Sequence, residues 1–195
     1  MWWRYKCNSF GFEILQMKSG LQNFFISINS ENGKLYLFGS VCSDGQKERS
    51  LKVPSEEFIN QTFSAVELGE GHGMAVLDTK PEKLLLWGKN EKHCLSVEKG
   101  KTAENQIVGT RQPLVHEWQK PVKSISARGY SSALMTEGGA VFYWGEFDSI
   151  FDKPLKLSTN EYVTQITVGK GYLIVANGTI STLPFFWVFL NLLGK

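Results

Sequence analysis

The feature of this sequence that most constrains its fold is an internal repeat. Three segments share one order of elements: an apolar run, a short polar gap, and a second apolar run that ends in an aromatic residue followed by glycine. These segments span residues 20–39, 69–88 and 128–145. A fourth copy begins at Gly169 and its pattern fades after Ile180. Because one unit of such a repeat cannot bury its apolar face alone, we expect neighbouring units to stack.

The spacing of the copies indicates the size of the unit. Equivalent first positions are Gly20, Gly69, Arg128 and Gly169, which are separated by 49, 59 and 41 residues. A period of about 50 residues with variable loops is typical of four-stranded propeller blades.

The apolar runs predict the strands of each unit. They are rich in β-branched and aromatic residues and are flanked by Gly, Asn, Asp or Pro. The predicted strands span 24–28, 35–38, 74–77, 84–87, 133–135 and 141–144. Their nearly continuous hydrophobicity predicts strands that are covered on both faces, as in stacked blades.

Two local signals lie outside these strands. Asn177-Gly178 predicts a two-residue hairpin turn between a strand at 173–176 and a strand at 179–180. Ser55, which follows Pro54, could cap a short helix over 55–59 in a connecting loop. Helices are otherwise not predicted.

The repeat motif selects among propeller types. The sequence has no Trp-Asp pair, which argues against WD repeats, and only one Gly-Gly pair, which argues against kelch repeats. The units instead resemble the repeats of the regulator of chromosome condensation family, which read approximately Ala-Gly-x-x-His, an apolar run, Tyr-x-Trp-Gly-x-Asn and Gly-Gln-Leu. The second copy matches this motif at Gly69, His72, Trp87, Gly88 and Asn90.

The other copies match the motif less fully. Phe38-Gly39 and Trp144-Gly145 stand at the aromatic-glycine position, while Asn23, Ser131 and Tyr172 stand where the histidine is expected. The resemblance covers residues 5 to about 182. The residues assigned to the structural repeat signature are Gly20, Phe38, Gly39, Gly69, His72, Trp87, Gly88, Asn90, Trp144, Gly145 and Gly169.

The resemblance implies an all-β fold, a β-propeller of the regulator of chromosome condensation type. Members of that family close a ring of seven blades, and this chain of 195 residues holds about three and a half, so the propeller is expected to be incomplete. We expect partial propeller repeats over 1–182 and a divergent hydrophobic C-terminal tail over 183–195. Since an open propeller leaves unpaired strand edges, we expect a truncated product or a half that pairs with another half.

The composition of the chain limits the partners and the cellular compartment that we expect for it. The net charge is +2 and the longest basic stretch is Lys47-Glu48-Arg49, so direct sequence-specific binding of nucleic acid is not expected. The three cysteines are far apart, which favours a reducing compartment over a disulfide framework. The apolar run 183–193 is shorter than the roughly 20 residues of a spanning helix, and no signal peptide is evident. We therefore expect no membrane contact and a cytoplasmic or nuclear location.

No catalytic, cofactor-binding or metal-binding set emerges from the motifs. His72 has no nucleophile or carboxylate at a recognisable spacing, and the repeat assigns it to structural hydrogen bonding between strands. Gly100-Lys101-Thr102 lacks the first glycine of a phosphate-binding loop. Residues 129–133 approach a nucleophile elbow, but a strand is predicted after them where that motif needs a helix. We therefore expect no cofactor and no metal.

Trp118 is the single candidate for an interaction residue. It lies among polar residues before Pro121, where an exposed tryptophan would anchor an interface. The alternative is that its ring packs against its own blade.

The resemblance implies two functions. The first is a non-enzymatic protein-protein interaction module, in which loops on one face of a rigid propeller scaffold bind a partner. The second is guanine-nucleotide exchange on a small GTPase, as in the founding member of the family, which displaces nucleotide with a loop or wedge. The implied partner is a protein, with a small GTPase and a chromatin-associated protein as the candidates.

Overall fold

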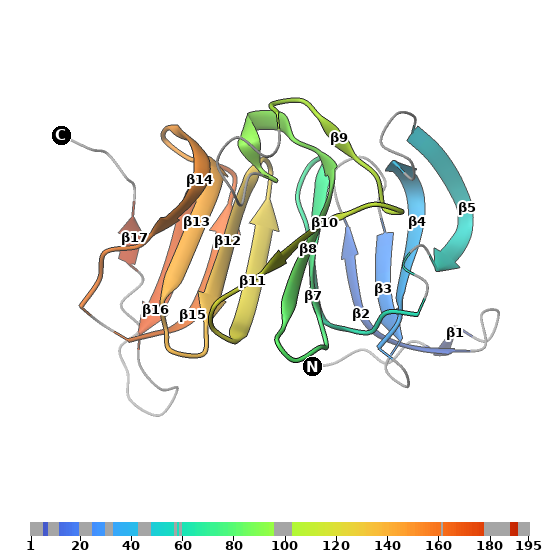
Figure 1. Ribbon diagram of the computed structural model, residues 1–195, viewed down its shortest axis with the longest axis horizontal. Coiled ribbons are helices and arrows are strands. Elements are labelled where there is room, and N and C mark those ends of the chain that lie inside the picture. Colours follow the sequence, from blue (N-terminus) through green and yellow to red (C-terminus); the bar gives the residue numbers. More distant parts are fainter. Residues whose placement is uncertain are drawn as a thin grey trace.

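The computed structural model describes residues 6–7, 12–19, 25–29, 33–42, 48–56, 58, 60–95, 103–160, 162–177 and 188–190. Over these residues the chain is almost entirely β-structure, with one short 3-10 helix, η1 (Glu91–His93). The strands form four antiparallel sheets that follow one another along the chain (Figure 1). The predicted all-β, incomplete propeller is therefore confirmed.

Each sheet is built from consecutive strands. Sheet 1 contains β1 (Lys6–Cys7), β2 (Phe12–Ser19), β3 (Phe25–Asn29), β4 (Leu35–Cys42) and β5 (Glu48–Glu56). Sheet 2 contains β6 (Phe63–Leu68), β7 (His72–Leu77), β8 (Lys83–Lys89), β9 (Ile107–Val108) and β10 (Leu114–Glu117). Sheet 3 contains β11 (Val122–Arg128), β12 (Ser131–Thr136), β13 (Val141–Glu146) and β14 (Ile150–Lys156). Sheet 4 contains β15 (Val163–Gly169), β16 (Tyr172–Asn177) and β17 (Val188–Leu190).

The central hairpins of sheets 2 and 3 share one register. The residue at the histidine position pairs with the glycine of the Trp-Gly pair, as His72 does with Gly88 and Ser131 with Gly145. In sheet 1, Phe38 pairs with Phe25, which lies one residue further along its strand than the position equivalent to Gly73, the partner of Trp87. The hairpins predicted over 74–87 and 133–144 are thus observed, and the hairpin predicted over 24–38 is observed from Phe25 onward.

Two local predictions are wrong. The strand that pairs with β16 is β17, with Val175 opposite Val188, so the predicted two-residue turn after Asn177 does not set this pairing. Thr179 and Ile180 themselves lie outside the described residues. Ser55 pairs with Leu37 in β5 rather than capping a helix, because pairing with β4 overrides the local helix signal.

The core lies between consecutive sheets as three buried clusters. The cluster between sheets 1 and 2 includes Leu37 and Trp87, that between sheets 2 and 3 includes Met74 and Trp144, and that between sheets 3 and 4 includes Val175. Every residue of β7 and β12 is buried, as predicted for strands that are covered on both faces.

One end of the sheet array carries five of the connections between strands. The turns at 69–71, 129–130 and 170–171, and the segments at 90–95 and 146–149 that follow β8 and β13, lie at this end. We call it the crown; it is the upper end in Figure 1.

Candidate interaction surface

A buried chain of hydrogen bonds joins sheets 2 and 3 just below the crown. His72 Nε2 lies 2.8 Å from Ser132 Oγ, which in turn donates to the backbone carbonyl of Cys94 at 3.0 Å. Trp144 Nε1 donates to the same carbonyl at 2.8 Å. All four residues are buried. We call this chain the inter-sheet link, because it fixes sheet 3 against the segment that follows β8.

The proton positions in the inter-sheet link follow from its geometry. The single hydroxyl hydrogen of Ser132 is donated in a hydrogen bond to the Cys94 carbonyl, so Ser132 Oγ accepts a hydrogen bond from a protonated His72 Nε2. His72 Nδ1 is then an unprotonated nitrogen, and it is buried without a hydrogen-bond partner. Burial lowers the pKa of His72 to about 4, which keeps the ring neutral at pH 7.

The serine-histidine contact resembles a catalytic pair in composition but not in arrangement. A general base must accept the nucleophile's proton and is oriented by a third group on its other nitrogen. Ser132 instead donates its hydroxyl hydrogen to the Cys94 carbonyl, and both side chains are buried between the sheets. The pair therefore acts as a structural contact between sheets.

In sheets 2 and 4 a glycine three residues before the histidine position makes room for a ring. A Cβ on Gly69 would lie 2.1 Å from His72 Cε1, and a Cβ on Gly169 would lie 1.9 Å from Tyr172 Cζ. Tyr172 therefore occupies in sheet 4 the place that His72 occupies in sheet 2. In sheet 3 the small Ser131 stands at this place, and its hydroxyl donates to the Glu146 carbonyl.

The glycines of the Trp-Gly pairs meet a different constraint. Gly88 and Gly145 have φ values of +103° and +90°, a region that side chains rarely adopt. A Cβ at Gly145 would also lie 2.1 Å from the Tyr130 carbonyl oxygen. Glycine at these positions lets the chain leave β8 and β13 close to the preceding turn.

The tryptophans of the same pairs fill the space between sheets. Trp87 is 2% exposed and its ring lies 5.0 Å from the Phe58 ring in an edge-on contact. Trp144 is fully buried in the cluster between sheets 2 and 3. Each tryptophan thus faces the sheet that precedes its own.

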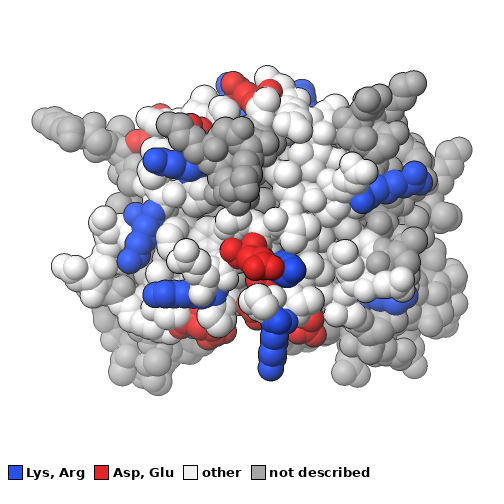
Figure 2. Space-filling model, in the orientation of Figure 1, with Lys and Arg blue, Asp and Glu red and all other residues white. Residues whose placement is uncertain are grey.

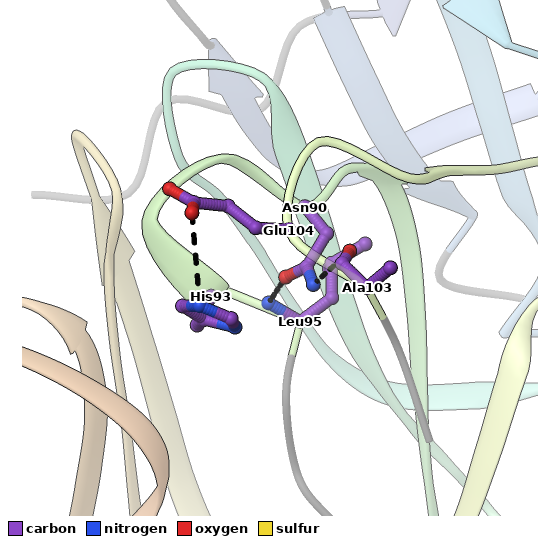
Figure 3. Close-up of polar contacts among 5 residues, drawn as sticks. All are labelled: Asn90, His93, Leu95, Ala103 and Glu104. Atoms are coloured by element: carbon purple, nitrogen blue, oxygen red, sulfur yellow. Dashed lines mark hydrogen bonds and ion pairs between the residues drawn. The ribbon is translucent and has the colours of Figure 1, made fainter. Parts of the chain in front are cut away.

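Asn90 holds the segment that connects β8 to β9 (Figure 3). Its side-chain amide donates to the Ala103 carbonyl and accepts from the Leu95 amide, both at 2.8 Å. Its backbone amide donates to Gln106, and its carbonyl accepts from Asn105, again at 2.8 Å. The fully buried Asn90 therefore ties both ends of this segment to the crown.

Polar side chains of sheets 2 and 3 meet on the crown above the inter-sheet link. The Tyr130 hydroxyl donates to the Glu91 carboxylate, which also pairs with Lys89. The hydrogen bond to Glu91 and partial burial raise the pKa of Tyr130 to about 12, with Glu70 and Glu146 close enough to add to this effect. Hydrogen bonds to Lys89 and Tyr130 lower the pKa of Glu91. We call these five residues the crown cluster.

Backbone hydrogen bonds fix the positions of the crown cluster. The Glu70 amide donates to the Gly129 carbonyl at 2.7 Å, which bridges the turns of sheets 2 and 3. The Glu146 amide donates to the Tyr130 carbonyl at 3.1 Å. The cluster is therefore attached to backbone that is held from both sheets.

Trp118 lies between sheets 2 and 3, away from the crown cluster. Its half-buried ring contacts Phe142 of β13 edge-on, with ring centroids 5.1 Å apart, and contacts His116 at 5.3 Å. The ring thus packs against residues of both sheets, His116 of sheet 2 and Phe142 of sheet 3. Its role in binding a partner stays a prediction.

The predicted repeat residues of the first copy lie in β4 or before it in the chain. Gly20 and Asn23 lie outside the described residues. Phe38 and Gly39 lie in β4, where the register is defined and Gly39 pairs with Leu51.

Sequence reasoning missed the partners that make these residues act together. No sequence motif marks Ser132 or the contact between Glu91 and Tyr130. A backbone carbonyl such as that of Cys94 cannot be recognised from the residue type. One signal was available: the histidine of one copy faces Ser132, which is the second residue of strand β12 in the next copy. That spacing could have suggested a bond between neighbouring units.

The described surface offers neither a metal site nor a single-sign patch on the face shown. Among residues with described positions, no group of three His, Cys, Asp or Glu side chains is placed to hold a metal ion. Acidic and basic side chains are intermixed on the face shown in Figure 2. No helix in the described ranges is long and apolar enough to cross a membrane.

These features define a class of fold: successive β-sheets that stack face to face through buried tryptophans, as in an incomplete propeller of the RCC1 type. Human WBSCR16 superposes with a TM-score of 0.67 at 18% identity, over 86% of this chain and 48% of that one. Yeast RCC1 (Prp20), solved with bound Kap60, superposes with a TM-score of 0.68 at 14% identity, over 90% of this chain and 49% of that one. The chain thus spans about half the length of these structures.

Two further comparisons add context. Prp20p from Saccharomyces cerevisiae, described together with its binding to Gsp1p and histones, matches with a TM-score of 0.52 at 13% identity, over 89% of this chain and 58% of that one. A Rho GTPase-activating protein, gacGG of Dictyostelium discoideum, is 28% identical over 159 residues, which are 80% of this chain and 12% of that protein. No family model matches the sequence.

Proposed function

We propose that this chain is a non-enzymatic protein-interaction module that binds a protein partner through the crown cluster. The observation that carries the proposal is the position of the cluster directly above the inter-sheet link. Glu70, Glu91 and Tyr130 come from two sheets, and these sheets are joined by the His72–Ser132 contact and by the Glu70–Gly129 backbone bond.

A rigid base favours binding because fewer side chains must be ordered when the partner arrives. Tyr130 supplies an aromatic surface, and the carboxylates around it supply hydrogen-bond acceptors for the partner. Tyrosine is among the residues that contribute most to protein interfaces. The described residues of the crown thus provide an aromatic ring and carboxylates for binding. Their arrangement is not one that suits covalent chemistry.

The fold comparisons favour a protein as the partner. Yeast RCC1 (Prp20) was solved with bound Kap60, and Prp20p was described with its binding to Gsp1p and histones. By analogy we propose a small GTPase or a chromatin-associated protein as the partner of this chain, in the cytoplasm or the nucleus. Guanine-nucleotide exchange is the second candidate function, since it needs a displacing loop rather than a catalytic triad.

The test compares two matched double variants in proximity labelling from living cells. Glu91→Lys with Tyr130→Ala alters the crown cluster, and Glu117→Lys with Tyr162→Ala makes the same changes at the other end of the sheets. We expect the crown variant to lose labelling of the wild-type partners by about tenfold or more, because truncating a central contact costs about 2 kcal/mol. Loss with the control variant and retention with the crown variant would place binding elsewhere.

A further inference from the structure

The outer edge of sheet 2 is formed by β10, which pairs with β8 on one side and with no described strand on the other. This strand lies at the front of the array in Figure 1. Val115 is 54% exposed and the side chain of Glu117 is 62% exposed, so the edge is open to solvent. We call the outward side of residues 114–117 the β10 edge.

One hydrogen bond determines the bonding pattern of the neighbouring strand β8. The Lys89 amide donates to the Gly71 carbonyl at 2.8 Å, and hydrogen-bonded pairs alternate along an antiparallel ladder. Because the register between β7 and β8 has no shift, the backbone groups of Leu84 and Leu86 do not bond to β7. Their N–H and C=O groups are directed toward β10.

The same alternation determines which backbone groups of β10 face outward. In the register of β8 and β10, these two leucines lie opposite His116 and Leu114, which therefore bond to β8. The N–H and C=O groups of Val115 and Glu117 point the other way, out of the sheet. They can pair with one more strand.

The β10 edge lacks the residues that protect other outer strands from pairing. Proline removes a backbone donor, and lysine on an edge hinders the approach of another chain. The sequences of β5 and β14, the outer strands of sheets 1 and 3, contain such residues: Arg49, Lys52 and Pro54 in β5, and Lys153, Pro154 and Lys156 in β14. The sequence of β10 contains no proline, lysine or arginine, and Val115 adds an exposed apolar side chain. Of these three outer strands, β10 is therefore the one on which pairing is least hindered.

We propose that the β10 edge binds an extended segment of a partner protein, which adds to sheet 2 as one more strand. The edge offers four residues, whereas a stable contact between two folded proteins takes about 20–30 residues from each. An extended segment needs only a short edge, because its main-chain hydrogen bonds provide affinity and its alternate side chains provide specificity. This site is separate from the crown cluster and goes beyond the proposed function.

The side chains of β10 indicate which residues the segment carries. Val115 and Glu117 lie on one face of sheet 2, opposite Leu85 and Lys83 of β8. An apolar residue opposite Val115 would cover its exposed surface. A basic residue opposite Glu117 would meet a carboxylate of which one oxygen, Oε1, pairs with Lys83 at 2.9 Å. In an antiparallel segment, the basic residue therefore precedes the apolar one by two positions.

The first test titrates the full ¹⁵N-labelled chain with a capped eight-residue threonine peptide that carries an arginine and, two positions later, a valine. NMR spectra follow the backbone amides up to millimolar peptide. We expect saturable shifts of the Val115 and Glu117 amides, because these amides donate to the added strand, and little change in β7. Absence of these shifts, or shifts centred on the crown, would overturn the proposal.

Two methylated peptides separate main-chain pairing from general adhesion. In the antiparallel register, the valine of the peptide exchanges two backbone hydrogen bonds with Val115, whereas the threonine between arginine and valine directs its N–H away from the edge. N-methylation of the valine should raise the dissociation constant by about tenfold or more, and N-methylation of that threonine should change it by less than about twofold. Equal effects of the two methyl groups would contradict pairing at this edge.

A matched pair of protein variants tests the edge from the other side. Val115→Pro removes an outward N–H and leaves the bonds from β10 to β8 in place, so it should weaken binding of the peptide by about tenfold or more. Val115→Ile keeps the N–H and the apolar side chain and should bind the peptide as the wild type does. Unchanged binding by Val115→Pro would overturn the proposal. Far-UV circular dichroism checks the fold of both variants, and the methylated peptides test the edge on the wild-type chain.

The β10 edge and the crown cluster are tested independently. Glu91→Lys with Tyr130→Ala alters the crown cluster only, so this variant should bind the peptide as the wild type does. Peptide binding that is lost with the crown variant would place the peptide on the crown and overturn the proposal. In the labelling experiment, a partner that is lost only with the Glu117 and Tyr162 changes would support binding at the β10 edge.

Discussion

At the residue scale, the inter-sheet link shows how one hydroxyl can connect two sheets. Ser132 accepts from His72 and donates to Cys94, so its oxygen satisfies a buried donor and a buried acceptor at once. Leaving a buried polar group without its partner costs more than the net gain from forming the bond. Replacing Ser132 should therefore destabilise the fold more than replacing an average serine.

We expect Ser132→Ala to lower the free energy of unfolding by about 1–3 kcal/mol, because the His72 Nε2 proton would be buried without an acceptor. The matched control is Ser124→Ala in the same sheet. Ser124 Oγ is buried without a hydrogen-bond partner, so this change should be neutral or slightly stabilising. Urea denaturation of both variants checks the prediction, and equal losses would contradict it.

A second residue-scale prediction concerns the Trp-Gly pairs. Gly145→Ala should destabilise the chain by at least about 2 kcal/mol, since alanine is strained at φ +90° and its Cβ would meet the Tyr130 carbonyl oxygen. Gly138→Ala should change stability by less than about 0.5 kcal/mol, because its Cβ would meet only Thr136 Oγ1 at 3.9 Å. Thermal unfolding of the two variants provides the measurement. Similar melting temperatures would argue against the clash.

At the element scale, the connection after β8 depends on one side chain. Asn90→Ala should leave the Leu95 amide without its acceptor and release the Ala103 carbonyl. We expect hydrogen exchange of the Leu95 and Asn105 amides to accelerate by about tenfold or more, with little change in β7. Exchange mass spectrometry after limited labelling measures both regions. Uniform acceleration across sheet 2 would instead indicate a global loss of stability.

The sequence predicted the elements whose signal is local. Residues 74–77 and 84–87 are apolar, β-prone runs bounded by turn residues, and both lie in the observed strands β7 and β8. The strand at 188–190 was missed because Asn177-Gly178 predicted a tight turn to 179–180, whereas β16 pairs with a strand further along the chain. The crown cluster was missed because Glu91 and Tyr130 meet only when two sheets stack.

At the scale of the whole molecule, His72 links folding stability to pH. Its pKa is lowered from 6.5 to about 4 in the folded chain, so the unfolded chain binds a proton first as the pH falls. The stability that the fold gains from keeping His72 neutral is fully present above about pH 6.5 and is lost as the pH approaches 4. We expect a loss of about 3 kcal/mol over this range from His72. Urea unfolding at several pH values should show this slope, and His72→Gln should flatten it.

A further whole-molecule prediction concerns nucleotide exchange. Release of nucleotide requires one continuous binding face and a displacing segment, and this chain spans about half of the matched structures. We expect no acceleration of fluorescent guanine-nucleotide release from a panel of small GTPases with stoichiometric protein. Acceleration of about tenfold on any GTPase would favour the exchange function over the interaction module.

The stacking of the sheets also determines how a disturbance spreads. Each buried cluster joins one sheet to the next, so the array behaves as a linear chain of nearest-neighbour couplings. Sheets 2 and 3 are coupled on both sides, whereas sheets 1 and 4 are each coupled on one side among the described residues. Fraying should therefore start at sheets 1 and 4 and proceed inward, while the link between sheets 2 and 3 opens last.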